Sequence, residues 1–309
     1  MRALVLAGGL SHERDVSLRS GRRVADALRS AGVDVDVRDA DAGLLAGLDA
    51  YDAAVIALHG GAGEDGALRE VLDLVGLPYV GSTPDACRLA WDKPTAKALL
   101  RRAGLATPDA AVLPHDSFRE LGAAAVLDRL VAALGLPLMV KPARGGSALG
   151  CSKVEGAEEL PAAMVTCFSY GEAALVERFA AGTEVAVGVV DTGDGPRALP
   201  AVEVRPLSGV YDYAARYTAG ATEFFVPARL PAADAAAVAE AAVAAHTALG
   251  LRDLSRVDLV VVDGVPQVLE VNVAPGMTET SLLPMAVDAA GLALGPLVVE
   301  LLAQAAARR

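Results

Sequence analysis

Three oxygen-bearing side chains stand in a stretch of the chain that is otherwise apolar. Asp258, Glu270 and Asn272 lie within two runs rich in valine and leucine, and the Asp263-Gly264 pair between the runs is typical of a β-hairpin turn. A carboxylate in such a strand is costly to bury unless a partner compensates for the lost water. Mg²⁺ takes oxygen ligands and usually leaves coordination positions to phosphates. The stretch therefore predicts a site that handles phosphate, and the alternative is a surface hairpin whose acids face water.

The register of this hairpin tests the prediction. Side chains alternate between the two faces of a strand, so Glu270 and Asn272 share a face. A two-residue loop would place Asp258 opposite Leu269, and hence on the wrong face. A three-residue loop with Gly264 left-handed, or an equivalent β-bulge, pairs Asp258 with Glu270 instead. We predict one of these two irregularities.

Further groups suited to phosphate flank the hairpin or lie earlier in the chain. Arg256 precedes Asp258 by two residues, and a Pro-Gly turn at 275–276 follows the second run. Lys141 lies in a predicted strand, and the glycine-rich turn after it, residues 144–154, can cradle phosphate through backbone N–H groups. The turn has the glycine spacing of a Walker A loop but lacks the Lys-Ser/Thr pair. It is weak evidence by itself, and the preceding lysine strengthens it.

Two loops of the N-terminal region supply more polar groups. Residues 11–14, Ser-His-Glu-Arg, follow the first predicted strand, where a ligand at the carboxyl end of a strand would lie. Residues 59–66, HGGAGEDG, follow a later strand, and their glycines permit close backbone approach to a ligand. This second loop also holds His59, Glu64 and Asp65. The alternative is an ordinary turn with a helix cap, which we favour for Asp65.

The elements that position these groups alternate between strand and helix, which indicates an α/β chain. Besides the hairpin, the predicted strands are residues 2–7, 33–37, 53–58, 135–142, 173–179, 184–190 and 198–204. The predicted helices are residues 16–31, 92–103, 232–249, 284–290 and 295–307. Residues 205–222 have no periodicity but hold three of the six tyrosines. A loop of that length is usually functional, often a lid, and simple anchoring by the rings is the alternative.

Composition narrows the functional classes. A chain of 309 residues can form two or three domains, and no apolar run approaches the length of a membrane span. Three scattered cysteines suit a reducing compartment, and the N-terminal residues do not resemble a signal peptide. A net charge of −12 argues against nucleic acid as the main partner. An acidic chain that handles a nucleotide must concentrate its cations locally, and it has only four lysines.

Eight segments, in order along nearly the whole chain, make it resemble the ATP-grasp enzymes and, within them, the D-alanine–D-alanine ligases. They are AGGLSHERDVSLRSG (7–21), HGGAGEDG (59–66), DKPTAK (92–97), LPLMVKPARGGSALG (136–150), LVERF (175–179), YDYAARY (211–217), SRVD (255–258) and LEVNVAPGMTETSLLPM (269–285). Each segment alone is modest evidence, and eight in order are strong. The resemblance implies an α/β (α+β) ATP-grasp fold with an N-terminal Rossmann-like, parallel-sheet domain. It also implies ATP-dependent joining of two D-alanines through an acyl phosphate.

The resemblance also implies where ATP and metal bind. Two Mg²⁺ ions, with Mn²⁺ as an alternative, would be held by Asp258, Glu270 and Asn272, with Glu270 bridging. ATP would lie between the central and C-terminal domains, with lysines on its phosphates, a strand end on its adenine and an acid on its ribose. The residues that match these nucleotide-binding positions are Lys93, Lys141, Ser147, Glu177, Phe179, Ala180, Glu184 and Arg216.

The substrate positions follow from the same resemblance. They are Glu13 for the ammonium of the first D-alanine, Ser147 and Tyr217 as its hydrogen-bonded partners, His59 beside the first substrate, Arg256 and the Gly276 N–H for the tetrahedral oxyanion, and Ser281 and Leu282 for the carboxylate of the second D-alanine. The chain departs from the family pattern in three places: Ala148 replaces a serine, Arg216 replaces the lid lysine, and Val273-Ala274 replace a threonine–serine pair. None removes a metal ligand, so we expect an active enzyme.

These observations lead us to expect three domains: residues 1–91, 92–172 and 173–309, the last with a lid at 205–222. By resemblance to the family, the expected protein makes D-Ala-D-Ala for peptidoglycan synthesis and is a homodimer. We expect it to be cytoplasmic, without a nucleic-acid or membrane partner. A ligase with another acceptor, such as D-serine or D-lactate, is the first alternative, although Tyr217 favours D-alanine by resemblance. A nucleotide-binding pseudoenzyme is the second, and the intact metal ligands, Arg256 and Lys141 argue against it.

Overall fold

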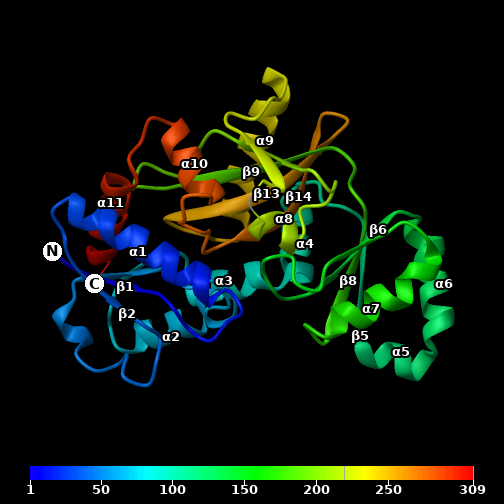
Figure 1. The fold of residues 1–309 in the computed structure, drawn as a ribbon, viewed down its shortest axis with the longest axis horizontal. Helices are drawn as coiled ribbons and strands as arrows, with labels where there is room; N and C mark the ends of the chain where they lie inside the picture. Colours follow the sequence, from blue (N-terminus) through cyan, green and yellow to red (C-terminus); the bar gives the residue numbers. More distant parts are fainter. Residues whose placement is uncertain (219, 309) are drawn as a thin grey trace.

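The computed structural model describes residues 1–218 and 220–308, without the side chain of Tyr217. Within these residues the chain forms three β-sheets that lie side by side along its long axis (Figure 1). The sheet formed by the last part of the sequence lies in the middle. No single described helix is long and apolar enough to cross a membrane. One pair of helices, residues 282–289 and 294–306, is long and apolar enough when taken together, but the two are bent by 104° relative to each other.

The N-terminal sheet is parallel, with the strand order β2-β1-β3-β4. Its strands are β1 (Arg2–Leu6), β2 (Asp34–Arg38), β3 (Ala53–Ile56) and β4 (Tyr79–Val80). Helices α1 (Arg14–Ser30) and α11 (Leu294–Ala306) pack on one face, and α2 (Ala67–Leu74) packs on the other. The apolar residues of β1 are fully buried because both faces are covered. Helix α11, from the far end of the sequence, thus completes the core of this domain (Figure 1).

The central sheet is antiparallel, with the order β5-β8-β6-β7. Its strands are β5 (Ala110–Pro114), β6 (Leu138–Pro142), β7 (Ser152–Val154) and β8 (Ala173–Arg178), and its helices are α5 (His115–Leu121), α6 (Ala123–Leu134) and α7 (Leu160–Phe168). The core lies between the sheet and helices α6 and α7. Because β8 pairs with β5 and β6, the expected boundary after residue 172 separates β8 from its own sheet. We place that boundary after Arg178.

The C-terminal sheet has the order β12-β11-β9-β13-β14, with β10 paired to β9. Its strands are β9 (Thr183–Val190), β10 (Arg197–Ala198), β11 (Val202–Pro206), β12 (Thr222–Phe225), β13 (Leu254–Val262) and β14 (Val265–Asn272). One face is covered by α9 (Ala232–Ala248), α3 (Pro84–Trp91) and α4 (Lys93–Arg102), and the other by α10 (Leu282–Ala289). Asp92 caps α4 by accepting the Thr95 N–H.

The segment expected to be an irregular lid, residues 205–222, is partly regular. It contains the end of β11, the short helix α8 (Tyr213–Tyr217) and the first residue of β12. Asp212 begins α8 because its carboxylate accepts the Ala215 N–H at 2.8 Å. The strand predicted at 198–204 is two strands, β10 and β11, with a break between them. Single 3₁₀ turns occur at Leu48–Ala50, Gly61–Gly63 and Ala157–Glu159.

The β13–β14 hairpin has the predicted pairing of Asp258 with Glu270. The irregularity that produces it is a bulge, since the register shifts between Asp258 and Leu259. Val262 pairs with Val265, so the turn has two residues and the three-residue loop does not form. The prediction of an equivalent β-bulge is therefore confirmed. It places both carboxylates on one face of the sheet.

Candidate active site

Two adjoining cavities lie where the three sheets meet. The first, of about 350 Å³, lies between the N-terminal loops and the β13–β14 hairpin. The second, of about 520 Å³, lies between the central and C-terminal sheets. The residues that line both cavities are Lys93, Gly145, Gly146, Tyr211, Arg216 and Glu270. The two cavities therefore adjoin along these residues.

Opposite charges from the hairpin and from α4 face one another at this junction. Arg256 binds both carboxylate oxygens of Asp258, with its Nε and Nη2 each 2.7 Å from an oxygen. Lys93 Nζ lies 3.7 Å from Glu270 Oε2. Burial by itself would raise the pKa of Glu270, but Lys93, Arg216, Lys141 and Arg256 lower it to about 2. Glu270 is therefore an anion in the working pH range, surrounded by four cations.

The predicted metal ligands lie close together but do not form a dedicated metal cage. Among the described residues, no group of three or more His, Cys, Asp or Glu side chains is arranged to hold a metal ion. The third donor is instead an amide, Asn272, whose Oδ1 accepts the Ala274 N–H at 2.9 Å. Two carboxylates and one amide are oxygen donors of the kind that Mg²⁺ takes alongside phosphate oxygens. The donor chemistry therefore fits a metal that arrives with a nucleotide.

A buried carboxylate between two lysines lies on the wall of the larger cavity. Glu177, on β8, is 2.5 Å from Lys141 Nζ and 2.5 Å from Lys97 Nζ. Burial opposes the charge of Glu177, but the two lysines hold its pKa below the ordinary range. Lys97 also donates to the Thr107 hydroxyl, and burial lowers its pKa to about 8. Sequence reasoning left Lys97 without a role, although it lies one helical turn after Lys93 on α4.

The glycine-rich turn is fixed to the start of α4. Lys93 donates through its N–H to the Ala143 carbonyl at 3.0 Å and through Nζ to the Gly145 carbonyl at 2.6 Å. Ser147 and Ala148 both have left-handed φ values, 50° and 55°. Such a conformation costs a residue with a Cβ atom free energy, and it persists only where the surroundings enforce it. The turn is therefore held in one shape at the junction of the two cavities.

The smaller cavity has two acids near each other on its N-terminal side. Ser147 donates a hydrogen bond to Glu13, which links the glycine-rich turn to the first loop. A Cβ at Gly60 would lie 2.5 Å from Glu13 Oε2, so this glycine lets the carboxylate approach the backbone. Glu64 accepts the Gly60 N–H at 3.0 Å, and burial together with the Glu13 charge raises the pKa of Glu64 to about 7. Two acids in one pocket favour a cationic group such as an ammonium.

His59 joins the N-terminal loops to the segment that follows β14. Its Nδ1 lies 3.0 Å from the Ala274 carbonyl, and its Nε2 lies 2.8 Å from Ser20 Oγ. A carbonyl only accepts, so Nδ1 carries the proton and Nε2 accepts the Ser20 hydroxyl, whose oxygen in turn accepts the Met277 N–H. Burial lowers the pKa of His59 to about 4, so the ring is neutral. Both nitrogens are engaged, and His59 therefore acts as a connector here.

The far end of the smaller cavity is built around the N-terminus of α10. Ser281 precedes this helix, and its Oγ accepts the Thr278 N–H at 3.0 Å. A Cβ at Gly276 would lie 2.6 Å from Ser281 Oγ, so only glycine allows this packing without displacement. Arg23, on α1, donates to the Thr278 carbonyl at 2.5 Å and fixes the loop to the N-terminal domain. Ser281 and Leu282 both line the cavity.

The segment 205–222 contributes a cation and an aromatic ring to both cavities. Arg216 Nε donates to the Tyr211 carbonyl at 3.3 Å, and the guanidinium lies 4.3 Å from the centre of the Tyr211 ring. Glu184, in the larger cavity, has its pKa raised to about 7 chiefly by burial. The side chain of Tyr217 lies outside the described residues, so its expected role as a hydrogen-bonded partner of Glu13, alongside Ser147, stays a prediction. Every other predicted site residue lines one of the two cavities.

The fold and the two-cavity site define an ATP-grasp ligase, and comparisons identify its family. The family model described as "D-ala D-ala ligase C-terminus" matches residues 99–303. The chain is 44% identical to the D-alanine–D-alanine ligase of Anaeromyxobacter sp. (strain K), over 99% of this chain and 97% of the relative. It is 43% identical to that of Bordetella petrii, over 98% and 92%. The chain belongs to the D-alanine–D-alanine ligase family.

Solved structures agree with this assignment. The D-alanine–D-alanine ligase from Bacillus anthracis complexed with ATP matches with a TM-score of 0.83 at 30% identity, over 100% of this chain and 98% of that chain. The VanG D-Ala:D-Ser ligase from Enterococcus faecalis matches with a TM-score of 0.84 at 27% identity, over 98% of each chain. The expected family and ATP-grasp fold are confirmed.

Proposed function

We propose that this chain joins two D-alanines at the expense of ATP, through D-alanyl phosphate, with release of ADP and phosphate. The observation that carries this proposal is the meeting of the two cavities at Lys93, Arg216 and Glu270. A nucleotide in the larger cavity can present its terminal phosphate there to an amino acid in the smaller one. In the larger cavity, Glu177, Phe179 and Ala180 would contact the adenine, and Glu184 the ribose.

In the first step, a carboxylate oxygen of the first D-alanine attacks the terminal phosphorus, and the bond to the ADP oxygen breaks. Both reactants are anions, so the step depends on neutralised charge and in-line alignment. Lys93, Lys141 and Arg216 supply fixed positive charge on the cavity walls. Glu13, oriented by Ser147, would hold the ammonium and leave the carboxylate to face the phosphate.

In the second step, the amine of the second D-alanine attacks the acyl carbon, and collapse of the tetrahedral intermediate expels phosphate. Arg256 and the Gly276 N–H would stabilise the oxyanion that forms. Ser281 and Leu282, at the N-terminus of α10, would bind the carboxylate of the second D-alanine, since backbone N–H groups and the helix dipole favour an anion there. The proton that the amine loses leaves with the expelled phosphate. His59 does not take it, because both of its ring nitrogens are engaged in hydrogen bonds.

Asp258, Glu270 and Asn272 would hold two Mg²⁺ ions, with Mn²⁺ as an alternative. Bound metal supplies positive charge to the phosphate oxygens. In the structure Arg256 donates hydrogen bonds to both oxygens of Asp258, and Lys93 faces Glu270. Metal must compete with these cations, so we expect tight metal binding only together with the nucleotide, whose phosphates add ligands of their own.

Phosphate release with ATP and Mg²⁺ tests the proposal when D-alanine, D-serine, D-lactate and L-alanine are compared as substrates. We expect turnover with D-alanine alone and D-Ala-D-Ala as the product. Turnover only with another pair would overturn the acceptor assignment in favour of a D-serine- or D-lactate-type ligase. Glu270→Ala should abolish turnover while the far-ultraviolet circular dichroism stays native, and retained activity would refute the metal assignment.

The wider setting is part of the same proposal. Family membership supports a cytoplasmic enzyme whose dipeptide enters peptidoglycan synthesis, acting on small molecules without a nucleic-acid or membrane partner. It also supports a homodimer as the active form. Light scattering coupled to size-exclusion chromatography measures the oligomeric state, and a monomer at full specific activity would refute the dimer.

A further inference from the structure

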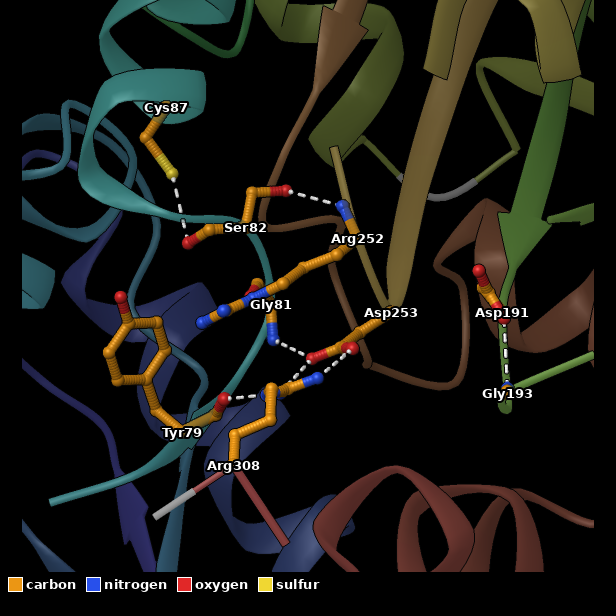
Figure 2. A network of polar contacts seen from close by, with 9 residues as sticks. All are labelled: Tyr79, Gly81, Ser82, Cys87, Asp191, Gly193, Arg252, Asp253 and Arg308. Atoms are coloured by element: carbon orange, nitrogen blue, oxygen red, sulfur yellow. Dashed lines mark hydrogen bonds and ion pairs between the residues drawn. The ribbon is translucent and has the colours of Figure 1, made fainter. Parts of the chain in front are cut away.

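A buried carboxylate outside both cavities holds three parts of the chain together. Asp253 lies in the loop between α9 and β13, fully buried, with a left-handed φ of 65°. It accepts the Gly81 N–H at 2.7 Å. It also accepts two hydrogen bonds from Arg308, each 2.7 Å long (Figure 2). A bidentate arginine and a backbone N–H thus supply hydrogen bonds to both oxygens of this buried carboxylate.

The segment at Arg252-Asp253 and the C-terminal Arg308 also hold the backbone at the end of β4. Arg308 donates to the Tyr79 carbonyl at 2.9 Å, and Arg252 donates through Nε to the Gly81 carbonyl at 2.6 Å. The Arg252 guanidinium also lies 5.2 Å from the centre of the Tyr79 ring. Figure 2 shows these side chains converging on the β4 end. The edge strand of the N-terminal sheet is thus tied to the C-terminal part of the chain.

We call the contacts among Asp253, Arg308, Arg252 and the end of β4 the clasp. It lies immediately before β13. β13 begins at Leu254, immediately after Asp253, and bears Arg256 and Asp258. The Asp253 carbonyl accepts the Asp191 N–H at 2.7 Å, which fixes the same loop to the end of β9. An ion pair between a buried acid on a strained backbone and a partly exposed arginine is a poor source of stability. Its geometry is therefore better explained by alignment of the β4 end with the start of β13 than by stability.

We propose that Asp253 and Arg308 are positioning residues that set the N-terminal sheet, with Glu13 and His59, against the strand that carries Arg256. This inference rests on the proposed ligase function. The smaller cavity is lined from both sides of this junction, whereas no residue before Lys93 lines the larger one. Loss of the clasp should therefore impair D-alanine binding and spare nucleotide binding.

The test compares Asp253→Asn, which tolerates the left-handed backbone, with Arg308→Lys, which keeps the charge but loses the bidentate pairing. Asp191→Asn is the matched control, because it makes the same chemical change at a neighbouring turn where the amide oxygen can still accept the Gly193 N–H. We expect the KM for D-alanine to rise about tenfold or more in both clasp variants, because small misplacements of substrate-positioning groups are costly. The Kd for a non-hydrolysable ATP analogue should stay within about twofold of wild type in all three proteins.

Equal losses of D-alanine and nucleotide affinity would show a general structural role and overturn the inference, as would an unchanged KM for D-alanine. If Asp253→Asn does not fold, Arg308→Lys carries the comparison. Hydrogen exchange at Gly81 gives a readout without turnover, since its amide should exchange faster in both variants than in Asp191→Asn. A wild-type protein inactive with D-alanine refutes the proposed function, whereas an active wild type with unaffected variants refutes only the clasp.

Discussion

Replacing His59 by asparagine should change how the stability of the protein depends on pH. Burial lowers the pKa of His59 to about 4, and the charge of Arg256 adds to this, although the Ala274 carbonyl opposes it. Asparagine keeps an N–H donor for Ala274 and does not titrate. Ser20 still accepts the Met277 N–H in the variant. The substitution therefore isolates the protonation of one buried ring.

The size of the effect follows from the two pKa values. In the unfolded chain His59 titrates near its ordinary value of 6.5, and in the folded chain near 4. Between these values the unfolded state binds more protons, so the stability that the neutral ring contributes is full above pH 6.5 and is lost as the pH falls toward 4. Integrating both titrations gives a loss of about 2 kcal/mol between pH 7 and pH 5.

Urea unfolding of wild type and His59→Asn at pH 7, 6 and 5 measures this loss. The wild type should lose about 2 kcal/mol more than the variant over that interval, because other titrating groups are common to both proteins. The gap should already be visible at pH 6 and should widen at pH 5. Parallel curves, within about 0.5 kcal/mol at every pH, would refute the buried neutral ring.

Three other substitutions test the site from different directions. Glu270→Gln should lower turnover at least about a hundredfold in the phosphate-release assay. The wild type should also be more stable than this variant above pH 4.5, and acid unfolding should show that difference fading toward pH 2. Ala148→Gly should raise the free energy of unfolding by about 1 kcal/mol by urea titration, since it relieves a left-handed alanine. Lys97→Met leaves Glu177 with one ammonium partner and should raise the KM for ATP about tenfold. An unchanged ratio of the KM values for ATP and D-alanine would contradict the role of Lys97.

The hairpin shows how far local sequence rules reach. That Asp258 and Glu270 need an irregularity to share a face could be predicted, because the side-chain period of two places Asp258 opposite Leu269 across a regular two-residue turn. Which irregularity produces the pairing depended on the turn. Asp263 and Gly264 have positive φ values of 49° and 78°, as a tight two-residue turn requires, so the extra residue moved into the strand at Leu269.

Residues whose roles depend on distant partners were beyond such rules. Asp253 stands 55 residues from Arg308 and 172 from Gly81, and in the sequence it is an unremarkable loop acid. The tautomer of His59 likewise depends on Ser20 and Ala274, which belong to different domains. Strand β8 was predicted correctly as a strand, but its place in the central sheet follows from pairing with β5 and β6. Such contacts arise only when the chain has folded.

The lysines explain how an acidic chain can hold a polyanion. With a net charge of −12, the chain has only four of them, Lys93, Lys97, Lys141 and Lys153. Each lines the larger cavity or contacts a residue that does, and Lys153 Nζ lies 4.3 Å from the centre of the Phe179 ring. Each is held by an acid, a carbonyl or a ring, so its charge is already in place. Fixed charges need little reorganisation when the nucleotide binds, and placement therefore matters more here than the overall charge.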